Sequence, residues 1–408
     1  MIKRLKALHI FNAAKLSAAT AVGQVISYAA APILSRLFSP QDFALFASFY
    51  AWIVPLAVFS TLRFEFSIPG TATESEAWSH ARWSLRTSSL IAVALSALLF
   101  LTSIFGVIHW HWSFLIGIGV LSISWAQVYN FLTTRLHAFK LNASSRIINN
   151  AVLNGVSILL GWLGMLQWGL VAGFVIGQLA TILFLVLALR RSAAQQEVDS
   201  HHPTIPWATV KPYVLFNTPQ GILETLQLSG IIAALEWWFS SAVTGAYYLC
   251  WRFLQAPVTL ISNTIFLSQY PKASELRREG KGYRRMIVST GAMLFGLSAP
   301  VGIVLFIWGP ELFAWFFGSE WRTAGEYAGW LAPWFVFNFS VSPFSYASLI
   351  EGRQKTSLII TSVDVCVKVA CLYWGHLYAD AVSAIALFSV ASSFILFITY
   401  LWYLRLAK

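Results

Sequence analysis

Long apolar runs recur along the whole chain of 408 residues, and they restrict its fold more than any other feature of the sequence. A helix needs about 20 mostly apolar residues to cross the hydrocarbon core of a bilayer. Runs of this kind cover residues 12–34, 43–62, 84–105, 112–133, 146–164, 168–189, 212–235, 242–268, 286–308, 324–350, 356–375 and 381–404. Little chain remains for a soluble domain, so we predict an all-α integral membrane protein with about 12 transmembrane helices.

The basic residues predict how these helices are oriented. Only 11% of the residues are charged, against roughly 25% in soluble domains, yet the net charge is +11. If the N-terminus is cytoplasmic, 23 of the 27 Lys and Arg residues lie in inside segments, whereas Arg36 and Arg322 lie outside and Arg252 and Lys368 lie within spans. The positive-inside rule then gives an N-in, C-in topology. The positive charge marks orientation and gives no reason to expect a nucleic-acid partner.

A polar stretch at residues 190–211 divides the predicted spans into two sets of six. We expect an N-terminal six-helix bundle at 1–189, a cytoplasmic linker at 190–211 and a C-terminal six-helix bundle at 212–408. The sequence FSPQDFALF at 38–46 is weakly echoed by FSSAVTGAY at 239–247, each directly after the first span of its half. Two pseudo-symmetric bundles of equal orientation are typical of alternating-access transporters.

Several enzyme classes lack their signatures in this sequence. The phosphate-binding pattern G-x-x-x-x-G-K-[ST] is absent, and the longest outside loop, about 308–323, is short for a glycan polymerase or ligase. The three cysteines, Cys250, Cys366 and Cys371, fall within spans and have no metal-binding spacing. We therefore expect a membrane transporter with no catalytic residue, no metal site and no cofactor other than a possible coupling H⁺ or Na⁺.

Polar residues within the spans mark the candidate sites, because charges at membrane depth are costly and usually face a cavity or a partner. They recur at steps of three and four, which places each set on one helix face. The candidates are Asn150 in span five, Asn217 and Glu224 in span seven, Arg252 and Gln255 in span eight, and Asp364 and Lys368 in span eleven. Polar turns on several helices predict a water-filled cleft between the two bundles.

Each charge also has a purely structural interpretation. Asp364 and Lys368 stand at i and i+4, so mutual neutralisation is as well supported as a binding role. Arg252 suits a phosphate ligand, because a guanidinium makes bidentate contacts with phosphate. Glu224 is a candidate for ion coupling, with a salt bridge to Arg252 as the alternative. Arg63, together with Glu65, lies at the cytoplasmic end of span two, where side chains can simply extend to the interface.

Short motifs along the whole chain resemble the Wzx-type flippases, the polysaccharide branch of the multidrug/oligosaccharidyl-lipid/polysaccharide exporter superfamily. The motifs are LSRLFSPQDFALF at 34–46, LRFE at 62–65, FSSAVTGAY at 239–247, WRF at 251–253, AP at 256–257, YPKAS at 270–274 and EGRQK at 351–355. One position departs from the family pattern, since Ala44 replaces a glycine that occurs only in the second copy, at Gly245.

The resemblance implies a flippase that moves undecaprenyl-pyrophosphate-linked oligosaccharide repeat units to the periplasmic leaflet of the bacterial inner membrane. These units supply O-antigen, capsule or exopolysaccharide, with a polysaccharide polymerase and a chain-length regulator as possible partners. The predicted substrate-binding residues are Arg252, Lys368, Arg63, Asn150, Gln255 and Asn217, and the predicted ion-coupling residues are Glu224 and Asp364. Two alternatives stay open: a drug/cation antiporter of the same superfamily and a membrane-embedded glycan polymerase.

Overall fold

The computed structural model describes residues 22–106, 109–193 and 205–408, and the regular structure in these ranges is helical, with no strand. The predicted all-α fold is therefore confirmed. Seven described helices are long and apolar enough to cross a membrane. They are α2 (Pro40–Thr61), α3 (Glu74–Ile104), α4 (Trp110–Arg135), α6 (Leu166–Ala193), α10 (Arg284–Phe317), α13 (Gln354–Tyr378) and α14 (Ala381–Leu406).

The other predicted spans also coincide with helices, but these are shorter or more polar. They are the helix at 22–37, α5 (Phe139–Trp162), α8 (Thr218–Trp238), α9 (Ser241–Arg278) and α11 (Arg322–Val341). Of the span predicted at 12–34, residues 12–21 lie outside the described residues. Three of them, α5, α8 and α9, carry the polar stripes that lower their mean hydropathy. The count of twelve spans and the N-in, C-in orientation stay predictions.

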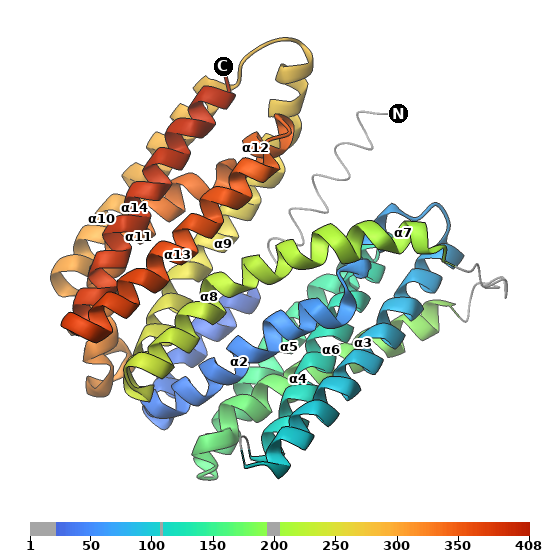
Figure 1. The fold of residues 1–408 in the computed structure, drawn as a ribbon, viewed down its shortest axis with the longest axis horizontal. Coiled ribbons are helices and arrows are strands. Elements are labelled where there is room, and N and C mark those ends of the chain that lie inside the picture. Colours follow the sequence, from blue (N-terminus) through green and yellow to red (C-terminus); the bar gives the residue numbers. More distant parts are fainter. Residues whose placement is uncertain (1–21, 107–108, 194–204) are drawn as a thin grey trace. The chain divides into compact units, whose positions relative to one another are not determined.

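Packing divides the chain into two compact units, shown in Figure 1. The N-terminal unit contains residues 22–30 and Ser48–Ser229, and the C-terminal unit contains Ala31–Ala47 and Gly230–Lys408. Helices α2 and α8 each begin in one unit and end in the other. This boundary differs from the predicted division at 190–211, part of which (194–204) lies outside the described residues. The two pseudo-symmetric bundles and the cleft between them stay predictions.

Small residues let the helices of the N-terminal unit approach closely. The most extensive contacts in this unit join α5 to α6 and α3 to α4. A Cβ atom at Gly173 in α6 would overlap the hydroxyl of Ser157 in α5. The hydroxyls of Ser60 in α2 and Ser124 in α4 lie 2.8 Å apart in a buried hydrogen bond. Close packing of this kind is the main attraction between helices in lipid, where apolar burial alone gives no driving force.

The C-terminal unit is built around α11, which packs against both α10 and α14. The backbones of α10 and α11 touch where Gly309 faces Gly325, because a Cβ atom on either glycine would overlap the other helix. The predicted span at 324–350 is not one helix. It ends as α11 at Val341 and continues as a 3₁₀ turn, η4 (Ser342–Ser345), and the short helix α12 (Tyr346–Ile350). Pro343 explains the break, since a proline cannot donate the backbone hydrogen bond of an α-helix.

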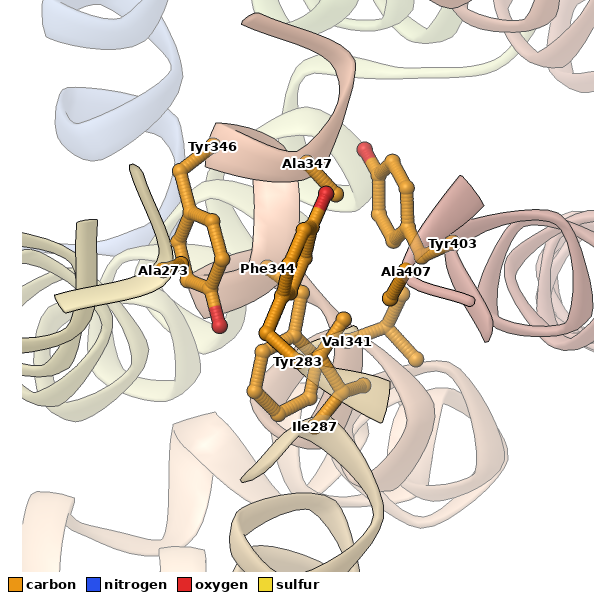
Figure 2. Packing of buried hydrophobic residues seen from close by; sticks show 9 residues of the cluster. All are labelled: Ala273, Tyr283, Ile287, Val341, Phe344, Tyr346, Ala347, Tyr403 and Ala407. Carbon is orange, nitrogen blue, oxygen red and sulfur yellow. The ribbon is translucent and has the colours of Figure 1, made fainter. Parts of the chain in front are cut away.

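One end of this unit is held together by the aromatic cluster shown in Figure 2. Tyr283 and Ile287 at the start of α10 pack with Phe344, Tyr346 and Tyr403, which come from η4, α12 and α14. Two backbone bonds reinforce the cluster, since the amides of Tyr283 and Arg284 donate to the carbonyl of Ala407 at 2.9 and 3.0 Å. The cluster fixes the ends of helices that are far apart in the sequence.

The two copies of the repeated motif pack against each other within the C-terminal unit. A Cβ atom at Gly245 in α9 would overlap the carbonyl oxygen of Pro40 at the start of α2. The rings of Phe46 and Tyr248 meet edge to face, with centroids 5.8 Å apart. Gly245 therefore permits the close crossing of α2 and α9, and this motif has a packing role.

Candidate functional site

In the N-terminal unit, the predicted residues Arg63 and Glu224 form an ion pair. An Arg63 guanidinium nitrogen lies 3.4 Å from Glu224 Oε2, and Gln220 donates a hydrogen bond of 3.1 Å to the other carboxylate oxygen. The Arg63 guanidinium also lies 4.9 Å from the centre of the Phe66 ring. The sequence left open a pair between Glu224 and Arg252, and the structure gives Glu224 a different partner.

The turn after α2 positions the Arg63 side chain at a cost in backbone energy. Leu62 and Arg63 both have positive φ angles, 51° and 54°. For residues with a Cβ atom this left-handed conformation costs about 1–2 kcal/mol each. The guanidinium then rests against Gly221, where a Cβ atom would overlap it, and its buried Nε has no hydrogen-bond partner among the described residues. The side chain is 14% exposed, so the interpretation of Arg63 as a residue that extends to the interface is wrong.

Glu65, two residues further on, is completely buried in the 3₁₀ turn η1 (Phe64–Gly70), so the same interpretation is wrong for this residue. Gln127 of α4 donates a hydrogen bond of 3.1 Å to Glu65 Oε1, while Oε2 has no partner among the described residues. Burial raises the pKa of the Glu65 carboxyl above its usual range, against the opposing effects of the Thr61 hydroxyl and the Arg63 charge. The sequence did not single out Glu65 as a buried acid, because its burial depends on α3 and α4.

Asn150 belongs to a hydrogen-bond network between the helix at 22–37 and α5. Ser27 donates to Asn150 Oδ1 at 2.8 Å, and Asn154 donates to the Ser27 hydroxyl at 3.2 Å. The Asn150 amide donates to the carbonyl of Arg146 at 2.8 Å. The polar stripe of α5 is thus used, in this part, for helix packing within the N-terminal unit.

Asn217 ends a segment of π-helix, Tyr213–Asn217, which directly precedes α8. Its side chain is exposed and makes no hydrogen bond to a described residue. Single turns of π-helix are frequent at functional sites, because the extra residue changes the direction of side chains. Asn217 is therefore available to an external ligand, and its predicted role in substrate binding stays a prediction.

In the C-terminal unit, Asp364 and Lys368 are bonded to each other. Lys368 Nζ lies 2.6 Å from Asp364 Oδ2, and the two side chains are 6% and 16% exposed in that order. Ser392 of α14 donates to the other Asp364 oxygen at 2.6 Å, and the Trp334 ring of α11 lies 5.7 Å from Lys368 Nζ. Mutual neutralisation, one of the two interpretations left open, is what the geometry shows.

Gln255 also has a partner within its unit. Asn338 of α11 donates to Gln255 Oε1 at 3.2 Å, and the Ser342 hydroxyl bonds to Asn338 Oδ1. The pair lies just before the break between α11 and η4. Gln255 therefore links α9 to this interruption, a role that its position in the polar stripe did not reveal.

Arg252 differs from the other two candidate cations, because it forms no ion pair or hydrogen bond with any residue in the described ranges. It lies half-buried on α9, between the aromatic residues Trp251 and Phe253. Arg63 and Lys368 are each paired to a carboxylate. Of these three candidate cations, Arg252 is the one without a carboxylate partner among the described residues, so it is the one available to an anionic ligand.

An apolar groove of about 500 Å³ runs along α13 but contains none of the predicted binding residues. It is lined by Leu358, Ile359, Ser362, Val363, Cys366, Val367 and Ala370. Asp364 and Lys368 lie on other faces of the same helix and pack against α14 and α11. Helix α13 thus separates an apolar surface from a buried ion pair.

Comparisons with solved structures identify the fold. A lipid II flippase, MurJ, in an inward closed conformation superposes with a TM-score of 0.72 at 14% identity, over 96% of this chain and 86% of that one. An inward-facing multidrug resistance MATE family transporter of the MOP superfamily gives 0.68 at 15% identity, over 94% of both chains. A MOP superfamily transporter from Pyrococcus furiosus gives 0.58 at 15% identity, over 97% and 95%.

These superpositions establish a transporter fold, that of a multi-pass membrane protein, but at 14–15% identity they do not transfer a substrate. No curated protein sequence matches the chain. A family model described as polysaccharide biosynthesis protein matches residues 33–326, which is well over half of the chain. The predicted resemblance is thereby confirmed: the chain belongs to the polysaccharide biosynthesis protein family and has the fold of membrane transporters and flippases, not that of an enzyme.

Proposed function

We propose that this protein flips undecaprenyl-pyrophosphate-linked oligosaccharide repeat units from the cytoplasmic to the periplasmic leaflet of the bacterial inner membrane. One observation carries the proposal: Arg252, on a predicted membrane span, is half-buried without an acidic partner among the described residues. A cation at membrane depth is costly unless an anion balances it. The pyrophosphate of a lipid carrier supplies that anion together with oxygens suited to bidentate contact.

Arg63 is the second phosphate contact in this proposal. Its partner Glu224 is 53% exposed, and an ion pair in contact with solvent contributes only about 0–1 kcal/mol. Arg63 can therefore exchange the carboxylate for a phosphate at little cost. Lys368 is the weakest of the three candidate phosphate contacts, because its buried bond to Asp364 must break before it can bind a phosphate.

Neutral polar side chains are suited to the sugar hydroxyls. Asn217 is exposed and has both amide donors and its acceptor oxygen available. Asn150 and Gln255 must give up hydrogen bonds to Ser27 and Asn338 before they can bind a sugar. The polyprenyl tail stays in the lipid, since it is too long to enclose.

Transport proceeds by exchange between cytoplasm-facing and periplasm-facing states, driven by H⁺ or Na⁺ coupling through Glu224 or Asp364. The pairing of both carboxylates with cations gives a simple mechanism, because protonation of either carboxylate releases its partner. The flipped repeat units then pass to a polymerase and a chain-length regulator that build the surface polysaccharide.

The experiment measures lipid-linked repeat units in a host from which the gene has been deleted. Without the protein, untranslocated units accumulate and surface polysaccharide is lost, and the wild-type gene restores it. Arg252→Ala is expected to reduce the rate at least tenfold, since hydrogen bonds to charged groups contribute about 1.5–3 kcal/mol. Arg252→Lys, which keeps the charge, is expected to retain part of the activity.

Arg86→Ala serves as the control, because Arg86 is an exposed cation of α3 that the proposal does not use. Normal surface polysaccharide with Arg252→Ala, at wild-type protein levels, contradicts the role of Arg252. A deletion strain that accumulates no lipid-linked units contradicts the function itself.

A drug/cation antiporter is the second candidate, and the likeness to a multidrug resistance MATE family transporter favours it. A cationic substrate needs a carboxylate that is free to bind it. Of the two predicted coupling carboxylates, Asp364 is held in a buried pair with Lys368, which argues against this candidate, whereas the solvent-exposed pair of Glu224 and Arg63 does not distinguish the two functions. Uptake of a fluorescent organic cation by proteoliposomes separates the two functions.

A further inference from the structure

The C-terminal unit gathers basic side chains from four separate segments at the end that contains the aromatic cluster of Figure 2. We name six of these residues the basic rim. They are Arg278, Arg284, Arg285, Arg353, Lys355 and Arg405, and all are exposed. They come from the end of α9, the start of α10, the turn before α13 together with the first residues of α13, and the end of α14.

The packing of this end explains why residues so distant in sequence share one surface. The amide of Arg284 donates to the carbonyl of Ala407, which joins the start of α10 to the end of α14. Arg277 at the end of α9 is bonded at 2.7 Å to Glu351 in the turn before α13. Figure 1 shows the same helix ends beside the C-terminus. The rim is therefore held by folded contacts and not by flexible chain.

The acidic residues of this end do not neutralise the rim. The stretches 272–285, 351–355 and 405–408 contain ten Lys and Arg residues and three Glu residues. Two of the glutamates are occupied by cations outside the rim, since Glu351 pairs with Arg277 and Glu279 pairs with Lys281. None of the six rim residues forms an ion pair with a residue that the structure describes.

The surroundings of the rim place it at the level of lipid headgroups. Val288, one turn into α10 from Arg284, is 43% exposed, and Leu401, one turn before Arg405, is 41% exposed. Trp402 stands beside Leu401 and is half-buried. Exposed apolar side chains followed within one turn by an aromatic residue and then by cations are typical of the boundary between hydrocarbon and headgroups.

We propose that the basic rim is a binding surface for anionic phospholipids in the leaflet that these helix ends face. The orientation rule requires only an excess of cations on one side of the membrane. The rule does not require that these cations lie together on one rigid surface, nor that the nearby glutamates are already paired with other cations. Clusters of four to eight Lys and Arg residues beside a transmembrane helix bind acidic lipids electrostatically. This proposal is independent of the transported substrate.

The test titrates the purified full-length chain, in zwitterionic detergent, with a tail-labelled phosphatidylglycerol, and uses phosphatidylcholine with the same tails for comparison. We expect phosphatidylglycerol to bind and phosphatidylcholine not to bind, with weaker binding at higher salt. Each cation at such a surface contributes about fivefold to affinity, so Arg284→Gln with Arg285→Gln is expected to weaken binding about 30-fold.

The control, Arg86→Gln with Lys140→Gln, removes two exposed cations of the N-terminal unit, from segments that the sequence assigns to the same membrane side. It is expected to bind as the wild type does. Arg353→Gln with Lys355→Gln tests the rim from a second segment, should the first variant fail to fold.

Three results overturn the proposal. Equal binding of the two lipids shows that the rim does not select charge. Equal losses in the rim and control variants show that only overall net charge matters. Complete displacement of the lipid by millimolar inorganic phosphate shows that the surface binds free phosphate and not a lipid headgroup.

Discussion

The buried pair of Asp364 and Lys368 makes a quantitative prediction that separates structure from transport. The two side chains are 16% and 6% exposed, 2.6 Å apart, and further held by Ser392 and Trp334. Removing one partner of a buried pair leaves an uncompensated charge and costs about 3–5 kcal/mol. Replacing both partners by neutral residues of similar size is often neutral or stabilising.

We therefore expect Lys368→Met to lower the free energy of unfolding by about 3–5 kcal/mol, and Asp364→Asn to have a similar effect. The double variant Asp364→Asn with Lys368→Met is expected to recover most of this loss, because the new amide oxygen still accepts the hydrogen bond from Ser392 and no charge is left buried. Denaturant titration of the purified protein in micelles, followed by tryptophan fluorescence, measures all three values.

Two results refute this reasoning. A double variant as unstable as either single variant shows that the charges do not compensate each other. A stable Lys368→Met variant shows that Asp364 is already protonated or reaches water. Transport by the double variant adds a second measurement: retained transport assigns the pair to structure, whereas lost transport in a stable protein assigns it to the substrate or the coupling ion.

Three further predictions concern positions where the local geometry is sharply defined. Gly221→Ala should destabilise the wild type by about 1–2 kcal/mol, because the new Cβ atom displaces the Arg63 guanidinium. In an Arg63→Ala background the same substitution should stabilise the protein by up to about 1 kcal/mol, because the overlap is gone and alanine has a higher helix propensity than glycine. Gly245→Ala should cost about 1–3 kcal/mol, because the new Cβ atom overlaps the Pro40 carbonyl, while Gly296→Ala in α10 should be tolerated, because open space surrounds it. Unfolding titrations measure the stability of the Gly221, Gly245 and Gly296 variants. Equal losses for Gly245→Ala and Gly296→Ala contradict the close crossing of α2 and α9. The raised pKa of Glu65 means that its protonated form stabilises the fold at acid pH and that this contribution is lost as pH rises through the raised value. Glu65→Gln should therefore be more stable than the wild type at pH 7.5, by about 1–3 kcal/mol, and no more stable near pH 4, as thermal unfolding at the two pH values will show; destabilisation at pH 7.5 disproves the desolvation argument.

The sequence could predict the contacts of the site that form between residues close together in the chain, but not those that form between distant residues. The bond between Asp364 and Lys368 was accessible, because residues four apart on a helix are always neighbours. The pair of Arg63 and Glu224 joins residues 161 positions apart, and no local rule selects Glu224 over the other acids. The burial of Glu65 depends in the same way on Gln127 and on the packing of α3 and α4 around η1.

The sequence by itself determined the class of protein and the approximate positions of most of the described helices, but not the break in the span predicted at 324–350. Hydrophobic length alone located them, because the bilayer imposes one dimension on every span. Only the tertiary structure decided which polar side chains are occupied and which are free. Asn150 and Gln255 stand beside Arg252 as candidates in the sequence, yet neighbouring helices supply hydrogen-bond partners to Asn150 and Gln255 and none, within the described residues, to Arg252. The reason is physical: hydropathy is a property of each residue, whereas satisfaction of a polar group is a property of its partners.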